Sequence, residues 1–421
     1  MNVSEPTKRV SLPREFPGVH YYGEDEEAAA LRVIRQRSPF RYYGANFLAE
    51  ADSLEKEYAA RLGRRYAQAV SSCTSGLAAA MAAFRVGPGQ EVLVPGFFWV
   101  STVAAIVRAG AVPVLVEIDE SFTMDPEDLE RKITPSSKLI LPVHMCGVPS
   151  DMPAIMAIAR RRGIAVLEDC AQANGAMLHG KPVGTFGDLA VFSFQMNKNI
   201  TAGEGGIIVT DDETLYLRAN AAHDLGVPWS GGLPVQDSPH AMWGAGARMN
   251  EIAAAIIRVQ LRKLDAITAH MRASKYRIRE ALSDLPGLQW RRIKDREGDS
   301  GPFIVAMFAT PEAAGRFARE ASARGLTCTH LPDYGLHVYC NVKALIEKRS
   351  NSADGFPWTH PANAALVRDY RRGALPKTDE LLARSVVCPV PSNLTPSQEN
   401  EYTAVFREAH GAAGIGRLIV T

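Results

Sequence analysis

The sequence predicts an α/β fold, in which a mainly parallel sheet carries helices on both faces and a smaller α+β domain follows. Short apolar segments alternate with helical segments between residues 66 and 210. This rhythm is typical of a parallel sheet whose crossover helices cover it. The chain also has 421 residues, more than a single hydrophobic core usually serves, so we expect a second domain.

The first 23 residues show neither a helical nor a strand period and are rich in proline, glycine and aromatic residues, so we expect an arm over the surface. Residues 24–36 predict a helix, acidic at its start and basic at its end, as the helix dipole prefers. The next loop carries Tyr42 and Tyr43 beside an arginine. These tyrosines are candidate substrate contacts, although aromatic residues in such loops more often pack a segment onto the core.

The elements that follow are predicted from apolar runs and their boundary residues. Strands are expected at 66–70, 92–95, 112–118, 139–144, 164–169, around 192 and at 207–210, and helices at 47–62, 77–85, 100–109, 126–133 and 151–162. Pro153 just inside one helix and Gly163 just after it are typical boundary signals. Further on, a strand at 302–308 and a helix at 311–324 precede a long irregular region, 332–373.

Polar and aromatic residues gather at the predicted carboxyl ends of the strands, where ligands of open parallel sheets bind. Each has an ordinary structural explanation, because such residues also cap helices, pack in cores or sit on exposed loops. The residues are Thr74, Ser75, Trp99, His144, Asp169, Gln172, Ser193 and Lys198.

Together these residue types describe a site for pyridoxal phosphate. Hydroxyl groups at a helix start accompany free backbone N–H groups that bind a phosphate, and Trp99 offers a flat face to an aromatic ring. A buried carboxylate such as Asp169 needs a cationic partner, for example a protonated ring nitrogen. Lys198 lies in a glycine-flanked loop after a strand, where desolvation would lower the pKa of the amine and prepare it for a Schiff base.

The chain resembles the sugar aminotransferases named after DegT, DnrJ and StrS, which are fold-type-I pyridoxal phosphate enzymes. The resemblance covers nearly the whole length, and its most specific parts are the sequence EDCAQA at 168–173 and SFQMNKN at 193–199 followed by GEGG. It implies a three-layer large domain of the aspartate-aminotransferase type, with a mainly parallel seven-stranded-type sheet, over residues 24–250. A long helix would lead into a smaller C-terminal domain, 251–421, and a homodimer would share its active sites.

The resemblance also implies a role for each site residue. Lys198 matches the Schiff-base lysine, Asp169 the partner of the pyridinium nitrogen, and Gln172 the residue that binds the ring hydroxyl. Trp99 matches the stacking aromatic residue. The phosphate contacts are matched by Thr74, Ser75 and Ser193.

Two features leave alternatives open. Gly246 stands where the family usually has an asparagine that reaches the phosphate in the neighbouring subunit, so that contact is in question. The loop 334–339, with His337 as a candidate substrate contact, either closes over the substrate or is simply a long loop of the smaller domain.

The expected reaction moves an amino group from Glu or Gln to a keto-sugar or keto-cyclitol, in antibiotic, secondary-metabolite or surface-sugar biosynthesis. A sugar dehydratase that depends on pyridoxal or pyridoxamine phosphate, or another elimination enzyme of the same fold, is the main alternative, but the family's dehydratases carry histidine in place of Lys198. A regulator or scaffold without catalysis is a further alternative, motivated by Gly246.

The composition argues against several other classes of protein. With 47 basic and 46 acidic side chains the formal net charge is +1, so neither nucleic acid nor an anionic membrane is an expected partner. No apolar run approaches the roughly 18 residues of a membrane helix, and no signal segment begins the chain. The six cysteines are scattered without metal-site spacing, as in a cytoplasmic protein with reduced thiols and no metal.

Overall fold

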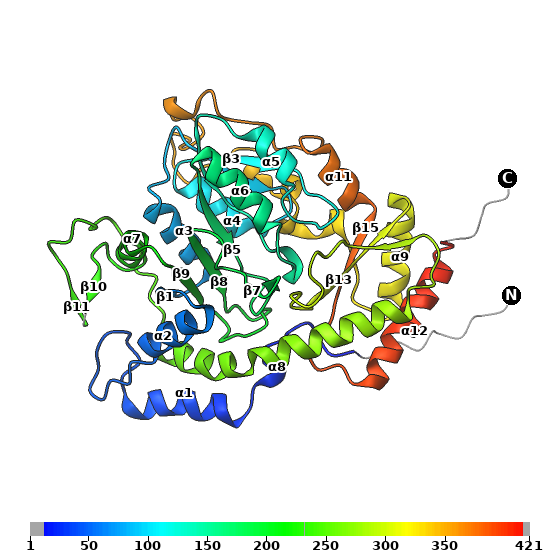
Figure 1. The fold of residues 1–421 in the computed structure, drawn as a ribbon, viewed down its shortest axis with the longest axis horizontal. Coiled ribbons are helices and arrows are strands. Elements are labelled where there is room, and N and C mark those ends of the chain that lie inside the picture. Colours follow the sequence, from blue (N-terminus) through cyan, green and yellow to red (C-terminus); the bar gives the residue numbers. More distant parts are fainter. Residues whose placement is uncertain (1–11, 231, 416–421) are drawn as a thin grey trace.

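The computed structural model describes residues 12–230 and 232–415, and a seven-stranded sheet lies at its centre (Figure 1). The strands of this sheet are β1 (Tyr66–Val70), β2 (Glu91–Pro95), β3 (Val112–Val116), β4 (Ser137–Ile140), β5 (Ala165–Asp169), β8 (Leu189–Ser193) and β9 (Gly206–Thr210). Their order is β1-β9-β8-β5-β4-β2-β3. The strand β9 runs antiparallel to both of its neighbours, β1 and β8, and all other neighbouring strands of this sheet are parallel. The predicted mainly parallel sheet is therefore confirmed.

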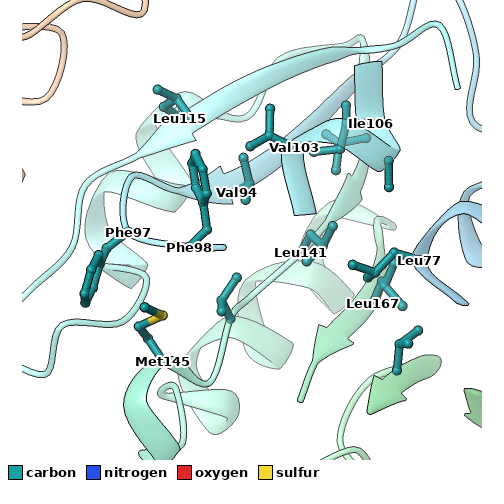
Figure 2. Packing of buried hydrophobic residues seen from close by; sticks show 14 of the residues in the cluster. Leu77, Val94, Phe97, Phe98, Val103, Ile106, Leu115, Leu141, Met145 and Leu167 are labelled. Carbon is teal, nitrogen blue, oxygen red and sulfur yellow. The ribbon is translucent and has the colours of Figure 1, made fainter. Parts of the chain in front are cut away.

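Helices cover both faces of this sheet. The side chains of successive strand residues point to opposite faces, so Val92 and Val94 of β2 belong to one apolar cluster and Leu93 to another. The first cluster also contains residues of α3 (Cys73–Ala83), α4 (Val100–Arg108) and α7 (Glu213–His223), and Figure 2 shows part of it. On the other face pack α2 (Glu50–Leu62), α5 (Pro126–Lys132), α6 (Met152–Arg162) and α8 (Glu251–Ala281).

A second, four-stranded antiparallel sheet forms the smaller part of the fold. Its order is β12-β13-β15-β14, and its strands are β12 (Leu288–Trp290), β13 (Phe303–Phe308), β14 (Thr329–His330) and β15 (Ser385–Pro389). The helices α9 (Pro311–Ala323) and α12 (Pro396–Ala412) share its apolar cluster. Between β14 and β15 the chain forms short 3₁₀ turns, α10 (Lys343–Ile346) and α11 (Pro376–Ala383), in agreement with the irregular region expected at 332–373.

The helix α8 joins the two parts of the fold. It packs against α1 (Glu24–Gln36) and α2 near its start and against α12 near its end (Figure 1). Val305 and Val387 of the smaller sheet belong to the same apolar cluster as β2. Because the two parts share this cluster, the domain division at residue 250 stays a prediction.

Several boundaries differ from the sequence prediction. The helix α3 begins at Cys73, four residues before the predicted start, because Ser72 and Ser75 form a reciprocal capping box there. The strand β4 ends at Ile140 rather than residue 144. His144 nevertheless stays beside β5, since its backbone N–H donates to the carbonyl of Asp169 at 3.0 Å.

The two remaining strand pairs are β6 (Met177–Leu178) with β7 (Lys181–Pro182), and β10 (Trp229–Ser230) with β11 (Leu233–Pro234). Within the described ranges, every helix is too short or too polar to cross a membrane. The free cysteines are buried, apart from the half-buried Cys340.

Alanine substitutions at two glycines with positive φ separate the energetic cost of backbone strain from that of a steric clash. Gly147 (φ 78°) lies at the contact with the segment before β13, where an added Cβ would lie 2.5 Å from Ser300 Oγ and Pro302 Cδ. We expect Gly147→Ala to lower the free energy of unfolding by about 2 to 4 kcal/mol, through left-handed strain and overpacking.

Gly163 (φ 65°) is the matched control, because an added Cβ would meet no atom within 4 Å. Gly163→Ala should therefore cost only about 1 kcal/mol. Urea unfolding measures the free energy of unfolding of both variants. Equal decreases would show that the close contact at Gly147 adds nothing to the cost of the substitution.

Candidate active site

A cavity of about 360 Å³ opens at the carboxyl ends of the central strands. Residues from α3, α4, β5, β8 and the loop after β8 line this main cavity, and predicted site residues among them are Thr74, Trp99, Asp169, Ser193, Lys198 and His337. A smaller side chamber of about 70 Å³ shares Asn197, Lys198 and His337 with it and is also lined by Gln172. Residues far apart in the sequence therefore meet around Lys198.

Asp169 ends β5 as a buried carboxylate without a cationic partner among the described residues. Its Oδ2 accepts a hydrogen bond from Thr102 Oγ1 at 2.8 Å, and its Oδ1 accepts one from the backbone N–H of Ala171 at 3.0 Å. Burial raises the pKa of the carboxyl, and these bonds and the charge of Lys198 offset only part of that rise. Asp169 would be stabilised by a cation placed in the cavity.

Glu168, the preceding residue, is equally buried but fully bonded. His144 Nδ1 accepts from the backbone N–H of Ser150 at 3.0 Å, so the ring proton lies on Nε2, which is 3.0 Å from Glu168 Oε2. Burial opposes ionisation, yet His144 and the backbone donors outweigh it and lower the pKa of Glu168. The backbone donors to Glu168 are Gly184, Phe186 and Gly187.

His144, Glu168 and Cys170 also lie close enough together, within 4.8 Å, to resemble a set of metal ligands. The hydrogen bonds just described already use both carboxylate oxygens and both imidazole nitrogens. The cluster is therefore explained as a buried hydrogen-bond network that holds the end of β5.

Lys198 lies in the loop 194–205 between β8 and β9. Its backbone N–H donates to Gln195 O at 2.9 Å, and its carbonyl accepts from Gly18 N–H at 3.1 Å. Burial lowers the pKa of the ammonium, while Cys73 and Asp169 oppose that shift. A lowered pKa increases the fraction of neutral amine, which is the nucleophilic form.

Aromatic residues form one wall of the main cavity. Trp99 caps α4, is 42% exposed, and its ring centroid lies 4.7 Å from that of His337. His337 stacks on Tyr334 at 4.1 Å, and burial lowers the pKa of its imidazole to about 4, so the ring is neutral at neutral pH. The structure thus brings the loop 334–339 to the site.

Gln172 is oriented by the backbone. Its Oε1 accepts a hydrogen bond from Cys146 N–H at 2.9 Å, which leaves the amide NH₂ available as a donor to a ligand. Cys146 itself has a left-handed backbone, with φ 55°.

Other predicted residues lie outside the two cavity linings. The hydroxyl of Ser75 belongs to the capping box of α3. Tyr42 is buried and stacks on Trp229 with centroids 3.8 Å apart, and Tyr43 is 65% exposed. Gly246 adopts φ 64°, and its N–H donates to Asp224 O at 2.6 Å.

The structure also adds residues that were not predicted. Ser101, whose hydroxyl bonds Thr74 Oγ1 at 2.8 Å, and Thr102 both follow Trp99 in the first turn of α4. Two hydroxyl residues at the second and third positions after the predicted stacking tryptophan were a usable sequence signal. Glu15 and Cys146 had none, because only the folded chain brings Glu15 into the lining of the side chamber and Cys146 close enough to affect the pKa of Lys198.

These groups fit pyridoxal phosphate. The cavity has the size of a cofactor site, Asp169 lacks a cation, Gln172 has a free amide NH₂, and Trp99 exposes a ring face. Thr74 and Ser193 lie in the same lining, at the start of α3 and the end of β8. The helix start adds backbone N–H groups for a phosphate.

Comparison with known proteins gives a family and a set of related folds. The DegT/DnrJ/EryC1/StrS aminotransferase family matches residues 22–329. The structure of 3-amino-5-hydroxybenzoic acid (AHBA) synthase is 27% identical, with a TM-score of 0.77 over 97% of this chain and 100% of that one. An aminotransferase from Psychrobacter cryohalolentis is 25% identical, with a TM-score of 0.79 over 96% of this chain and 100% of that one.

The E. coli GDP-4-keto-6-deoxy-D-mannose-3-dehydratase, solved with bound hydrated PLP, is 21% identical, with a TM-score of 0.76 over 92% of this chain and 97% of that one. At this identity the likeness shows the fold alone.

We expect opposite effects from removing the two carboxylates of β5 in the cofactor-free protein. Asp169→Asn should raise stability near neutral pH by about 1 kcal/mol, because it removes a buried charge without a cationic partner. A raised carboxyl pKa means that the folded state binds the proton more tightly. The gain should therefore vanish as the pH falls through the folded pKa to the unfolded one, where both states are protonated.

Glu168→Gln should instead lower stability by about 3 kcal/mol near neutral pH, because His144 and the backbone donors lose a charged acceptor. With a lowered folded pKa, this contribution is present above the unfolded pKa and is lost as the pH falls through the folded pKa. Urea unfolding over a series of pH values measures both variants. Changes of the same sign would contradict the opposite electrostatics of the two carboxyls.

Proposed function

Because the chain belongs to the DegT/DnrJ/EryC1/StrS aminotransferase family, we propose that it transfers an amino group from glutamate or glutamine to a keto-sugar or keto-cyclitol. As a member of that family it is an aminotransferase, and pyridoxal phosphate is its cofactor. The observation that carries the proposal is the single cavity in which Lys198, Asp169 and Trp99 meet. Their chemistry matches the aldehyde, ring nitrogen and ring face of the cofactor.

Each of the residues around the cavity would bind a different group of the cofactor. Lys198 would hold the aldehyde carbon, Asp169 the ring nitrogen, and Gln172 the ring hydroxyl. Trp99 would cover a ring face. The phosphate would be held by the start of α3 with Thr74 and Ser193. When bound, pyridoxal phosphate supplies a carbonyl that exchanges amino groups and a ring that withdraws electrons from the substrate carbon.

Lys198 is the proton carrier in this proposal. Its lowered pKa lets Nζ accept a proton from the substrate carbon and return it within the same site. Asp169 stays ionised beside a cationic ring nitrogen, because that partner offsets the desolvation of its carboxylate. His337 is neutral and adds no positive charge beside Lys198.

We also propose a homodimer with shared active sites. The segment 224–246, which includes the β10–β11 pair, extends from one end of the molecule (Figure 1). It exposes large apolar side chains: Leu225 by 66%, Leu233 by 70% and Trp243 by 96%. Such a concentration of exposed apolar residues is typical of a protein interface, and a second copy of this chain is the partner that the family suggests.

A sugar dehydratase of the same fold remains the alternative reaction. The lysine at position 198, in place of the histidine known for the family's dehydratases, favours amino transfer. The two reactions also differ in their products, because amino transfer leaves the nitrogen of the donor on the sugar, whereas dehydration removes water and leaves no amine on the sugar.

The first experiment measures the two half-reactions of the holoenzyme. Glutamate or glutamine should bleach the visible absorbance of the cofactor and release the corresponding oxo acid, and a panel of keto-sugars and keto-cyclitols should restore the absorbance. In Lys198→Ala, borohydride reduction should no longer fix the cofactor covalently to the protein. The rate of amino transfer should fall at least about a hundredfold.

Lys56→Ala is the matched control, since Lys56 is exposed on α2. If borohydride still fixed the cofactor covalently in Lys198→Ala, the assignment of Lys198 as the Schiff-base lysine would be wrong. A dehydrated keto-sugar product that carries no nitrogen would instead indicate the dehydratase.

Gly246 provides a test of the cross-subunit phosphate contact. Its left-handed backbone is compatible with asparagine, and an added Cβ would come no closer than 3.8 Å to its nearest neighbour, Leu225. We expect Gly246→Asn to tighten pyridoxal phosphate binding by about 2- to 10-fold, through one added hydrogen bond.

Equilibrium dialysis with pyridoxal phosphate measures this effect. Gly246→Ala is the control, because it has the same backbone requirement without the amide donor. Identical dissociation constants for the two variants would indicate that residue 246 does not reach the phosphate.

A further inference from the structure

The N-terminal arm is anchored to the loop that carries Lys198. Gly18 N–H donates to the carbonyl of Lys198 at 3.1 Å, and Ser392 Oγ donates to the carbonyl of Pro17 at 2.8 Å. A Cβ on Gly18 would lie 3.0 Å from the backbone of Ile200, so the absence of a side chain permits this close approach. Residues 15–18 of the arm are therefore part of the active-site wall, and not only a surface covering. The start of the predicted arm, residues 1–11, lies outside the described residues.

This anchoring places Glu15, three residues before Gly18, in the lining of the side chamber. Glu15 is the one acidic residue among the described residues of that lining, and its polar neighbours there are Gln172, Asn197, Lys198, Asn199, Tyr334 and His337. The volume of about 70 Å³ suits a functional group of a substrate rather than a whole sugar.

The Glu15 carboxylate has no hydrogen-bond donor or cation among the described residues. Burial raises its pKa, and no hydrogen bond or positive charge counteracts that rise. Two buried carboxylates of the chain differ, since Glu26 pairs with Lys263 and Glu399 with Arg277. A half-buried carboxylate that is left without a donor in the protein can be satisfied by a ligand.

We propose that Glu15 determines specificity by accepting hydrogen bonds from hydroxyl groups of the keto acceptor. This inference rests on the proposed function. A carboxylate has two acceptor oxygens and binds neutral O–H donors strongly. The donor amino acid carries carboxylates, which Glu15 would repel, whereas a polyhydroxylated ketone carries only donors and neutral acceptors. The side chamber thus separates the two substrates of one site by their charge.

The test compares both half-reactions in Glu15→Gln. The kcat/KM for the keto acceptor should fall about 10- to 100-fold, mainly through KM, because a charge-assisted hydrogen bond is lost. The amino-donor half-reaction should be as fast as in wild type or faster, because the substitution removes a charge that repels the carboxylates of the donor. Glu24→Gln, which removes an exposed carboxylate at the start of α1, should change neither. A parallel fall in both half-reactions would overturn the inference.

A binding measurement needs no turnover. Isothermal titration of the pyridoxal phosphate holoenzyme with myo-inositol should give the same affinity for wild type and Glu24→Gln, and an affinity about tenfold or more weaker for Glu15→Gln. Equal affinities, or no binding to wild type, would overturn the inference. The thermal midpoint of Glu15→Gln should equal or exceed that of wild type, because the carboxylate has no partner to lose. A lower midpoint would assign Glu15 a structural role instead.

The two readouts separate this inference from the proposed function. If wild type releases no oxo acid from glutamate or glutamine while myo-inositol binding still depends on Glu15, the proposed amino transfer fails and the hydroxyl site stands. If wild type transfers amino groups and Glu15→Gln behaves as wild type, the role of Glu15 fails alone.

Discussion

The buried charge of Asp169 is the constraint on which the site depends. Burying a carboxylate without a paired cation costs free energy, and the two neutral donors and the charge of Lys198 offset only part of that cost. The buried carboxylate of Glu168 is instead stabilised within the protein, by hydrogen bonds from His144 and backbone N–H groups. Because neighbouring strand residues point to opposite faces, β5 carries one satisfied carboxylate that supports the fold and one that needs a ligand.

The topology of the sheet explains why Lys198 faces that carboxylate. Parallel strands need long crossover connections, whereas antiparallel strands can be joined by a loop. The segment 194–205 is such a loop, so β9 returns antiparallel beside β8 and Lys198 stays at the end of the sheet. The lysine is held near Asp169 by the backbone of the sheet and does not depend on the flexibility of a long connection.

The walls of the site come from segments outside the sheet. The region between β14 and β15 contributes Tyr334 and His337, and the arm contributes Glu15. Rigid strand ends suit the positions that bind the cofactor, because these require fixed geometry. Loops and arms suit the positions that contact substrates, because connecting segments tolerate variation. We infer that the residues of the loops and the arm determine which acceptor binds, and that the residues at the strand ends determine the chemistry.

The sequence alone determined the α/β class, the mainly parallel sheet and the gathering of Lys198, Asp169 and Trp99 around one cavity, because apolar periodicity and strand-end polarity are local signals. The capping box of Ser72 and Ser75 is also a local signal, and because of it α3 begins earlier than predicted. Only the tertiary structure decided the stacking of Tyr42 on Trp229 and the position of Glu15 in the lining of the side chamber. These contacts join residues that are far apart in the chain, and their energies come from burial and packing, which no local pattern records.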